Sequence, residues 1–289
     1  MNGLMHRYTH RVPDVSKVIG ALLAEKVIDR AEDIENDHIA FRTLGLPHLG
    51  IACLERIFLH YGYQRRDRYE FPEKKLTAYW YAPPADHFPR IFISELKVKS
   101  LSQETQDIIL QYAGKVVQDP LGTVDLDDPS AVDAFLHASL WEVPRHWEYT
   151  TLLRESEYAA WVLYNRYYLN HFTISVHNLS SGYGTIPDFN AFLERHGFKL
   201  NDAGGKYKVS EDGLLWQSST VSELVEARFA DGGIHRIAGS YVEFAERKVL
   251  PAYQWLDPAL TGRQHRREGF EAANADKIFE STYTSQLLK

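Results

Sequence analysis

Three short segments of the chain each place one potential metal ligand among apolar residues. The segments DHIAFR (37–42), NHFT (170–173) and YVEF (241–244) alternate as strands do, and they carry His38, His171 and Glu243. Two imidazoles and one carboxylate form the ligand set of a facial triad, which holds iron(II) and leaves three coordination positions open for substrate and oxygen. If the three strands converge, the sequence predicts a mononuclear non-haem iron oxygenase.

The same residues allow a plainer reading, because a single His or Glu in a strand is usually exposed or satisfied by a hydrogen bond. The repeated placement of the candidates argues against coincidence, although the chain contains 13 His. His177 is the main competitor as a ligand, since it lies on the same strand face as His171 if that strand continues. His235, near the final strand, is a weaker competitor. Ligand softness alone does not choose among iron(II), manganese and zinc.

Arg42 and Glu95 are two further candidates. Arg42 lies on the same strand face as His38, about 13 Å farther along at roughly 3.3 Å per residue. Its guanidinium is suited to grip the anionic end of a ligand whose other end binds the metal. The alternative is a surface salt bridge to Glu35 or Asp37. Glu95 stands in the apolar context ISEL, and a buried carboxylate there needs a cation or a partner.

Composition argues against several classes of protein. The 289 residues are 44% hydrophobic and 25% charged, which is typical of a globular protein. The net charge of −7 and the lack of a basic stripe argue against a nucleic-acid partner. The chain has no run of about 18 apolar residues and no signal-peptide pattern, and its only cysteine, Cys53, fits a reducing compartment. We therefore expect a cytoplasmic protein with no membrane partner, whose oligomeric state cannot be read from the sequence.

Hydrophobic periodicity indicates the same order of elements twice. The first copy is a strand at 38–43, a helix at 51–61 and strands at 68–71, 76–81 and 90–98. The second is a strand at 171–176, a helix at 186–196 and strands near 207–209, 214–221 and 240–244. Further helices are expected at 14–34, 105–117, 129–140, 155–167 and near 270–279. Each copy opens on a strand with His (His38, His171) and closes on a strand with Glu (Glu95, Glu243).

The sequence therefore predicts an α+β fold in which two βαβββ modules form a partly closed mixed sheet around a metal site, with a helical insert and flanking helices. The predicted segments are an N-terminal helical segment (1–36), the first module (37–100), the helical insert (101–166), the second module (167–250) and a C-terminal segment (251–289). We expect the two modules to form one structural domain, with ligands contributed by both.

This duplicated module, with His on its first strand and Glu on its last, resembles the vicinal oxygen chelate superfamily. The segments DHIAFRT, FISEL, NHFT and YVEF are similar to those of the 2-oxoadipate dioxygenase/decarboxylase family, over roughly residues 15–250. The resemblance implies iron(II) held by His38, His171 and Glu243, with zinc or nickel as possible substitutes in purified protein. It also implies that Arg42 binds substrate and that Glu95 supports the ligands or acts as a fourth one.

The resemblance further implies a reaction in which 2-oxoadipate and oxygen give 2-hydroxyglutarate and carbon dioxide, a step in lysine catabolism. The substrate supplies its own 2-oxo acid, so no separate 2-oxoglutarate is needed. This chain is shorter than well-studied members, so the chemistry is better supported than the exact substrate. Two alternatives stay open. One is a metal-dependent isomerase, lyase or hydrolase of the same fold, and the other is a non-catalytic module that binds a small molecule.

Overall fold

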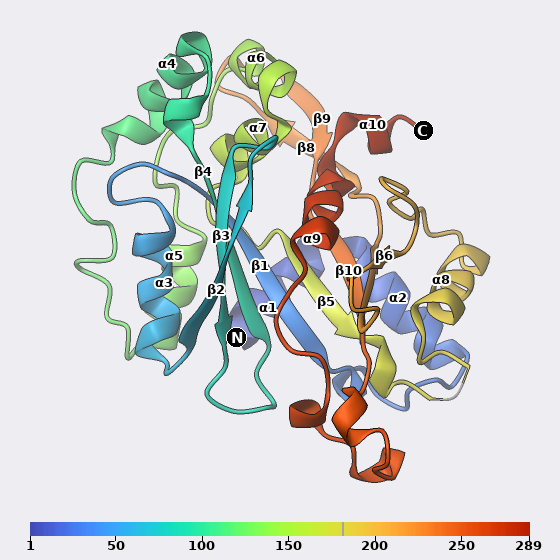
Figure 1. The fold of residues 1–289 in the computed structure, drawn as a ribbon. Helices are drawn as coiled ribbons and strands as arrows, with labels where there is room; N and C mark the ends of the chain where they lie inside the picture. The colour runs from blue at the N-terminus through green and yellow to red at the C-terminus, as the bar shows by residue number, and fades with distance from the viewer. Residues whose placement is uncertain (181) are drawn as a thin grey trace.

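The computed structural model describes residues 1–180 and 182–289, and its centre is a curled mixed β-sheet (Figure 1). Within these residues the sheet has eight strands in the order β2-β3-β4-β1-β5-β10-β7-β6. Their bounds, in that order, are Gln64–Phe71, Leu76–Ala82, Arg90–Leu96, Asn36–Leu44, His171–Ser175, Tyr241–Arg247, Leu215–Ser219 and Lys208–Val209. The central strands β1 and β5 pair antiparallel, whereas β1 is parallel to β4 and β5 is parallel to β10.

The predicted pair of βαβββ modules in one mixed sheet is confirmed. The first module is β1–α3–β2–β3–β4, with α3 at Ile51–His60, and the second is β5–α8–β6–β7–β10, with α8 at Ile186–Arg195. The antiparallel pairing of β1 with β5 joins them edge to edge. The periodicity does not predict a separate hairpin between β7 and β10, formed by β8 (Leu224–Arg228) and β9 (Ile234–Ala238). The segment boundaries drawn from the sequence stay predictions.

The other helices lie outside the repeated modules. They are α1 (Asn2–Arg11), α2 (Pro13–Ala24), α4 (Gln103–Tyr112), α5 (Pro129–Leu136), α6 (His146–Glu155), α7 (Glu157–Asn165), α9 (Ala272–Ile278) and α10 (Thr284–Leu287). The predicted helix at 14–34 is wrong beyond Ala24, because Lys26 has a positive φ of 57°, which ends the helix in the left-handed region. The periodicity also missed α1, which buries little more than Leu4 and Tyr8.

Side-chain alternation along the central strands divides the sheet into two faces. On the helix face, Phe41 of β1 packs 5.6 Å from Phe58 of α3, and Phe244 of β10 packs 5.0 Å from Phe189 of α8, measured between ring centroids. The residues one position away, such as Ala40, point to the opposite side, which we call the cavity face. There α9 from the C-terminal segment lies over the sheet (Figure 1), while α7 from the helical insert packs near the far end of β1, where the Tyr158 ring lies near Arg42.

The described part of the chain contains no helix with the length and apolar character that crossing a membrane requires.

Candidate metal centre

His38, His171 and Glu243 meet at one point on the cavity face. Because β1, β5 and β10 are adjacent strands, the register aligns His38, Thr173 and Glu243 in one row and places His171 in the next. His171 Nε2 lies 3.0 Å from Glu243 Oε2 and 3.3 Å from His38 Nε2, and His38 Nε2 lies 3.5 Å from Glu243 Oε2. All three side chains are buried. The structure thus brings together the three residues that the sequence singles out as ligands.

The donor set fits a divalent cation. Donor atoms held about 2.1 Å from one ion and at right angles to each other lie about 3.0 Å apart. The separations here run from 3.0 to 3.5 Å. Among residues 1–180 and 182–289, this is the one group of three or more His, Cys, Asp or Glu whose ligand atoms lie so close together. Two imidazoles and one carboxylate on a shared face are typical of sites that leave positions open for substrate.

Asp37 holds the His38 ring in the orientation that a metal ligand needs. Its carboxylate accepts from His38 Nδ1–H at 2.8 Å, so Nε2 faces the cluster without a proton. Arg247 donates to both Asp37 oxygens, at 2.6 and 2.9 Å, and Arg90 donates to one at 3.2 Å. Burial alone would raise the pKa of Asp37, but the charges of Arg247 and Arg90 outweigh it and hold that pKa well below its usual range. An ionised carboxylate therefore stands behind the imidazole.

The other two residues of the cluster are supported in the same way. The side-chain oxygen of Asn170 accepts from His171 Nδ1–H at 3.2 Å. Gln217 of β7 donates to Glu243 Oε1 at 2.6 Å, and Asn274 of α9 donates to the Gln217 oxygen at 3.0 Å. These contacts leave Oε2 of Glu243 facing the histidines.

These supporting residues were not predicted from the sequence, although the sequence contains one pattern that points to two of them. A polar Asp or Asn directly precedes the His at the start of both modules, as Asp37 and Asn170. The repetition at the same offset would have predicted a partner for each imidazole. Arg90, Arg247 and Gln217 carry no comparable signal, because each acts only through residues that are distant in the chain.

Charges within the cluster favour a cation between the three side chains. Burial would raise the pKa of Glu243, but the imidazoles of His38 and His171 outweigh it and lower that pKa to about 2. Burial opposes a charge on each imidazole. In His38 the carboxylates of Glu243 and Asp37 outweigh burial and raise the pKa, whereas in His171 burial prevails and lowers the pKa. Glu243 is therefore held as a carboxylate, and a divalent cation bound between the three side chains would pair with that buried charge.

Arg42 reaches the same cavity from the far end of β1. Its guanidinium donates to Thr282 Oγ1 at 3.0 Å and to the Phe279 carbonyl at 3.1 Å, while Nε has no partner among residues 1–180 and 182–289. The rings of Tyr158 and Trp161 in α7 lie 5.1 and 5.2 Å from the guanidinium carbon. Arg42 is only 1% exposed and forms no ion pair among the described residues. The surface salt bridge considered from the sequence is therefore wrong.

Tyr241 stands between Arg42 and the cluster. Its ring centroid lies 4.9 Å from that of His171. Burial raises the pKa of Tyr241 above its ordinary value, and the nearby charge of Arg42 opposes this shift. The phenol is therefore protonated at neutral pH, and it lies close to both ends of the site.

The cavity that joins Arg42 to the cluster is small. Its volume is about 20 Å³, which is room for about one water molecule. Phe92 of β4 lines it from the sheet, and Phe270, Ile278 and Phe279 of the C-terminal segment line it from above. We call residues 269–282 the cover. A ligand larger than one water molecule therefore requires the lining side chains or the cover to move.

Glu95 does not join the cluster, and the prediction that it supports the ligands or acts as a fourth one is wrong. Strand pairing aligns Ala40 with Phe92 in the first module and Thr173 with Glu243 in the second, so the counterpart of Glu243 is Phe92. Glu95 lies three residues further and faces the helix side, where it accepts from the Ile51 N–H at the start of α3, at 2.7 Å.

The true counterpart of Glu95 is Glu246, which also lies three residues beyond the aligned position. Glu246 accepts from the Ile186 N–H at the start of α8, at 2.9 Å. The two modules therefore share a carboxylate that caps the N-terminus of their helix, where unpaired N–H groups and the helix dipole favour a negative charge.

The competing histidines also lie outside the cluster. The strand of His171 ends at Ser175, and His177 lies in a short 3-10 helix, where its Nδ1 accepts from the Arg247 backbone N–H at 3.2 Å. His235 lies on β9 and stacks on His146, with 3.4 Å between ring centroids. Neither imidazole is available to the same metal.

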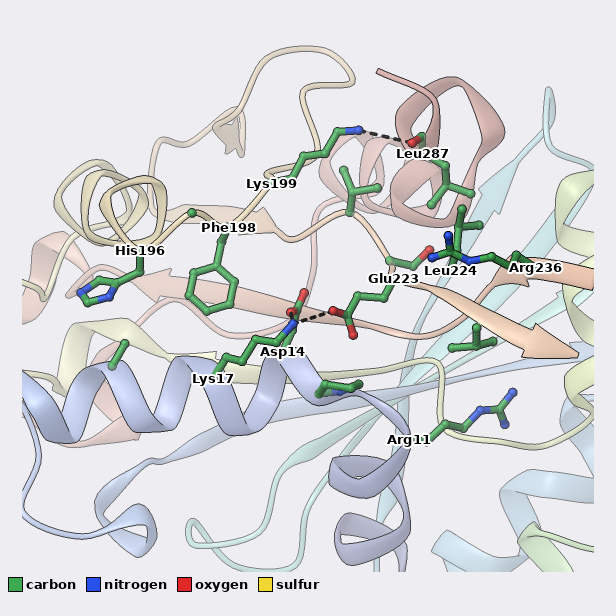
Figure 2. A pocket seen from close by; sticks show the side chains of 16 residues that line it. Arg11, Asp14, Lys17, His196, Phe198, Lys199, Glu223, Leu224, Arg236 and Leu287 are labelled. Carbon is green, nitrogen blue, oxygen red and sulfur yellow. Dashed lines mark hydrogen bonds and ion pairs between the residues drawn. The ribbon is translucent and has the colours of Figure 1, made fainter.

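A second, larger cavity lies elsewhere, as a surface groove of about 750 Å³ between α2, the end of α8 and the β8–β9 hairpin (Figure 2). Lys17 lies between two carboxylates there, 3.1 Å from Asp14 and 2.7 Å from Glu223. Lys199 donates to the Leu287 carbonyl at 3.4 Å. The groove contains none of the three clustered ligands, so size does not identify the site.

Solved structures share this arrangement of strands and helices. A glyoxalase-superfamily protein from Ralstonia eutropha JMP134 superposes with a TM-score of 0.70 at 23% identity, covering 93% of this chain and 83% of that one. The two proteins therefore share a fold, a curled mixed sheet with helices. The hydroxyglutarate synthase of Oryza sativa, in complex with 2-oxoadipate, superposes with a TM-score of 0.88 at 43% identity, covering 100% of this chain and 92% of that one.

Sequence comparison identifies the family. The family model described as 2-oxoadipate dioxygenase/decarboxylase matches residues 1–256. The chloroplastic 2-oxoadipate dioxygenase/decarboxylase of Arabidopsis thaliana is 48% identical over 262 residues, which are 87% of this chain and 69% of that protein. The chloroplastic/amyloplastic protein of the same name from Oryza sativa subsp. japonica is 47% identical over 264 residues, 88% of this chain and 70% of that protein. The chain belongs to the 2-oxoadipate dioxygenase/decarboxylase family, which confirms the resemblance drawn from its sequence.

Proposed function

We propose that this protein is an iron(II)-dependent dioxygenase/decarboxylase that converts 2-oxoadipate and oxygen to 2-hydroxyglutarate and carbon dioxide. One observation carries the proposal. The His38–His171–Glu243 cluster lines one end of a small cavity, and the other end is lined by Arg42, which is buried and forms no ion pair within the described part of the chain. A 2-oxo dicarboxylic acid has a chelating end for the first and an anionic end for the second. The family membership and the 2-oxoadipate complex of the Oryza sativa protein support the same substrate.

The residues divide the work by position. His38, His171 and Glu243 would hold the metal, which when bound supplies a Lewis acid and a binding place for oxygen. Arg42 neutralises the distal carboxylate and thereby fixes the distance of the 2-oxo acid from the cluster. Phe92, which lines the cavity together with Phe270 and Phe279, helps to keep water from the reacting end. Asp37 keeps the His38 ring oriented throughout.

Oxygen consumption with iron(II) across a panel of 2-oxo acids tests the proposal. We expect uptake with 2-oxoadipate, one carbon dioxide per oxygen consumed and no turnover under anaerobic conditions. His171→Ala should abolish turnover, whereas Arg42→Ala should mainly raise the KM for 2-oxoadipate. His235→Ala, which removes an imidazole remote from the cluster, is the matched control and should retain activity. Absence of oxygen uptake with every 2-oxo acid would contradict the proposal.

The same assay separates the alternative functions. Turnover without oxygen, with zinc or nickel bound, would indicate an isomerase, lyase or hydrolase. Purified protein that neither contains metal nor responds to added iron would indicate a binding module. A place in lysine catabolism is part of the proposal, since 2-oxoadipate is the substrate proposed. The cytoplasmic location stays a prediction. The relatives from Arabidopsis thaliana and Oryza sativa are named as plastid proteins.

A further inference from the structure

The cavity is lined by buried hydrogen-bond donors that have no acceptor. Arg42 Nε, Asn170 Nδ2 and Tyr241 Oη each lack a partner in the structure, and all three residues line the cavity. Every one of these atoms can donate a hydrogen bond, and buried donors are otherwise almost always paired. Three orphaned donors around one cavity therefore indicate a ligand rich in acceptor oxygens.

Strand register places two of these donors in order along the cavity. His38 and Glu243 share one row of the sheet, Ala40, His171 and Tyr241 form the next, and Arg42 lies one row further. Successive rows on one face are about 6.6 Å apart at roughly 3.3 Å per residue. Tyr241 thus stands one row from the carboxylate of the cluster and one row from Arg42.

The Tyr241 hydroxyl forms no hydrogen bond with the described part of the chain. Its backbone carbonyl accepts from the Tyr8 hydroxyl, so the main chain at this position is held independently of the side-chain hydroxyl. The amide of Asn170 differs, because its oxygen already serves His171. The Tyr241 hydroxyl is therefore a donor near Arg42 that has neither an acceptor among the described residues nor a structural role.

We propose that Tyr241 is a specificity-determining residue whose hydroxyl, together with Arg42 Nε, donates to the distal carboxylate of the substrate. This inference rests on the proposed function, because it takes the other end of the same 2-oxo acid to lie at the cluster. Two N–H groups of Arg42 are already given to Thr282 and Phe279. Arg42 Nε and Tyr241 Oη then provide one donor for each carboxylate oxygen, and a substrate without that carboxylate leaves both unpaired.

Tyr241→Phe tests the inference by comparing 2-oxoadipate with 2-oxohexanoate, a monocarboxylate with the same number of carbons. We expect the KM for 2-oxoadipate to rise about ten- to hundredfold with kcat nearly unchanged, since a hydrogen bond to a charged group is lost. The kcat/KM for 2-oxohexanoate, or its Ki against 2-oxoadipate where turnover is too slow, should change less than twofold. Tyr63→Phe, which removes a buried hydroxyl bonded to the Pro89 carbonyl, is the control and should alter neither.

Two further measurements separate a specificity role from a structural one. Iron(II) affinity should be the same in Tyr241→Phe as in the unaltered protein and Tm should change little, because the hydroxyl forms no hydrogen bond within the described part of the chain. Equal weakening of both substrates, or no weakening of either, would overturn the inference. Failure of the unaltered protein to consume oxygen with 2-oxoadipate would instead reject the proposed function, and anaerobic binding titrations of the two acids with iron(II) would still report on Tyr241.

Discussion

At the scale of single residues, each prospective ligand has a polar partner behind it. Asp37 orients His38, Asn170 faces His171, and Gln217 binds the outer oxygen of Glu243. Such partners fix the ring or carboxylate orientation before a metal arrives, so that binding requires little rearrangement. The three ligands are therefore preorganised by residues that never touch the metal.

The Asp37 carboxylate should contribute strongly to metal affinity. Asp37→Asn removes the charge behind His38, and we expect iron(II) binding to weaken about 10- to 100-fold. The variant also leaves Arg90 and Arg247 without their shared counter-charge. Titration with iron(II) under anaerobic conditions measures the effect. Glu35→Gln, which neutralises a nearby carboxylate outside this network, should bind iron(II) normally, and unchanged affinity in Asp37→Asn would contradict the role assigned here.

Ala40 should set the space available for the substrate chain. It lies in the row between the cluster and Arg42 and lines the cavity with the smallest side chain that has a Cβ. Ala40→Leu should abolish oxygen uptake with 2-oxoadipate while iron(II) binding persists, at a stability cost of about 1–3 kcal/mol from overpacking. Ala40→Gly keeps the space and should remain active. Oxygen uptake at the normal rate in the leucine variant would show that the substrate takes another path.

At the scale of elements, the cover connects both ends of the site. Thr282 and Phe279 hold Arg42, and Asn274 reaches Glu243 through Gln217. The family match ends at residue 256, so these contacts come from a part of the chain beyond the matched residues. Since the cavity has room for about one water molecule, we expect the cover to open when substrate binds.

Hydrogen–deuterium exchange should detect this opening. Amides of residues 270–282 should exchange faster than those of β10 in the free protein, because the cover opens locally while the central strand does not. Anaerobic 2-oxoadipate with iron(II) should slow exchange in the cover, since the bound ligand stabilises the closed form. Residues 51–60, on the helix face, should be unaffected. Equal exchange with and without ligand would argue that the substrate enters elsewhere.

The sequence was sufficient for the repeated modules and for the three clustered residues. Strand alternation located His38, His171 and Glu243, and the repeat required their strands to meet. The prediction for Glu95 failed. Residue type and order suggested that Glu95 is equivalent to Glu243, but the strand register places Glu95 three positions beyond the equivalent residue. An odd shift reverses the face of a strand. The cover was recognised only as a helix near 270–279, because nothing local shows which surface a helix will meet.

At the scale of the whole molecule, the site lies at the junction of two halves. His38 comes from the first module, and His171 and Glu243 come from the second, across the antiparallel pair β1–β5. Separation of the modules would remove the cluster even if each half kept its own core. Metal binding should therefore stabilise the union of the two halves, because it requires both.

The folded protein should lose stability in acid below neutral pH. Burial, assisted by the charge of Arg266, lowers the pKa of His177 from 6.5 to about 3. The unfolded chain therefore binds a proton between about pH 6.5 and pH 3 that the folded chain does not, and stability falls as pH decreases through this window. Urea unfolding at pH 7 and pH 5 measures the change. His177→Gln should show a smaller difference between the two, and an identical difference would exclude His177 as the source.

The paired helix caps show which features the two modules share and which they do not. Glu95 with Ile51 and Glu246 with Ile186 occupy equivalent places in the two modules. On the opposite side of the same strands, Phe92 stands where its counterpart is Glu243. Both modules therefore carry the capping carboxylate on the helix face, whereas on the cavity face one module carries a carboxylate and the other a phenyl ring. The repeat is thus kept on the helix face, where the carboxylates cap helices, and broken on the cavity face, where the prospective metal ligands lie.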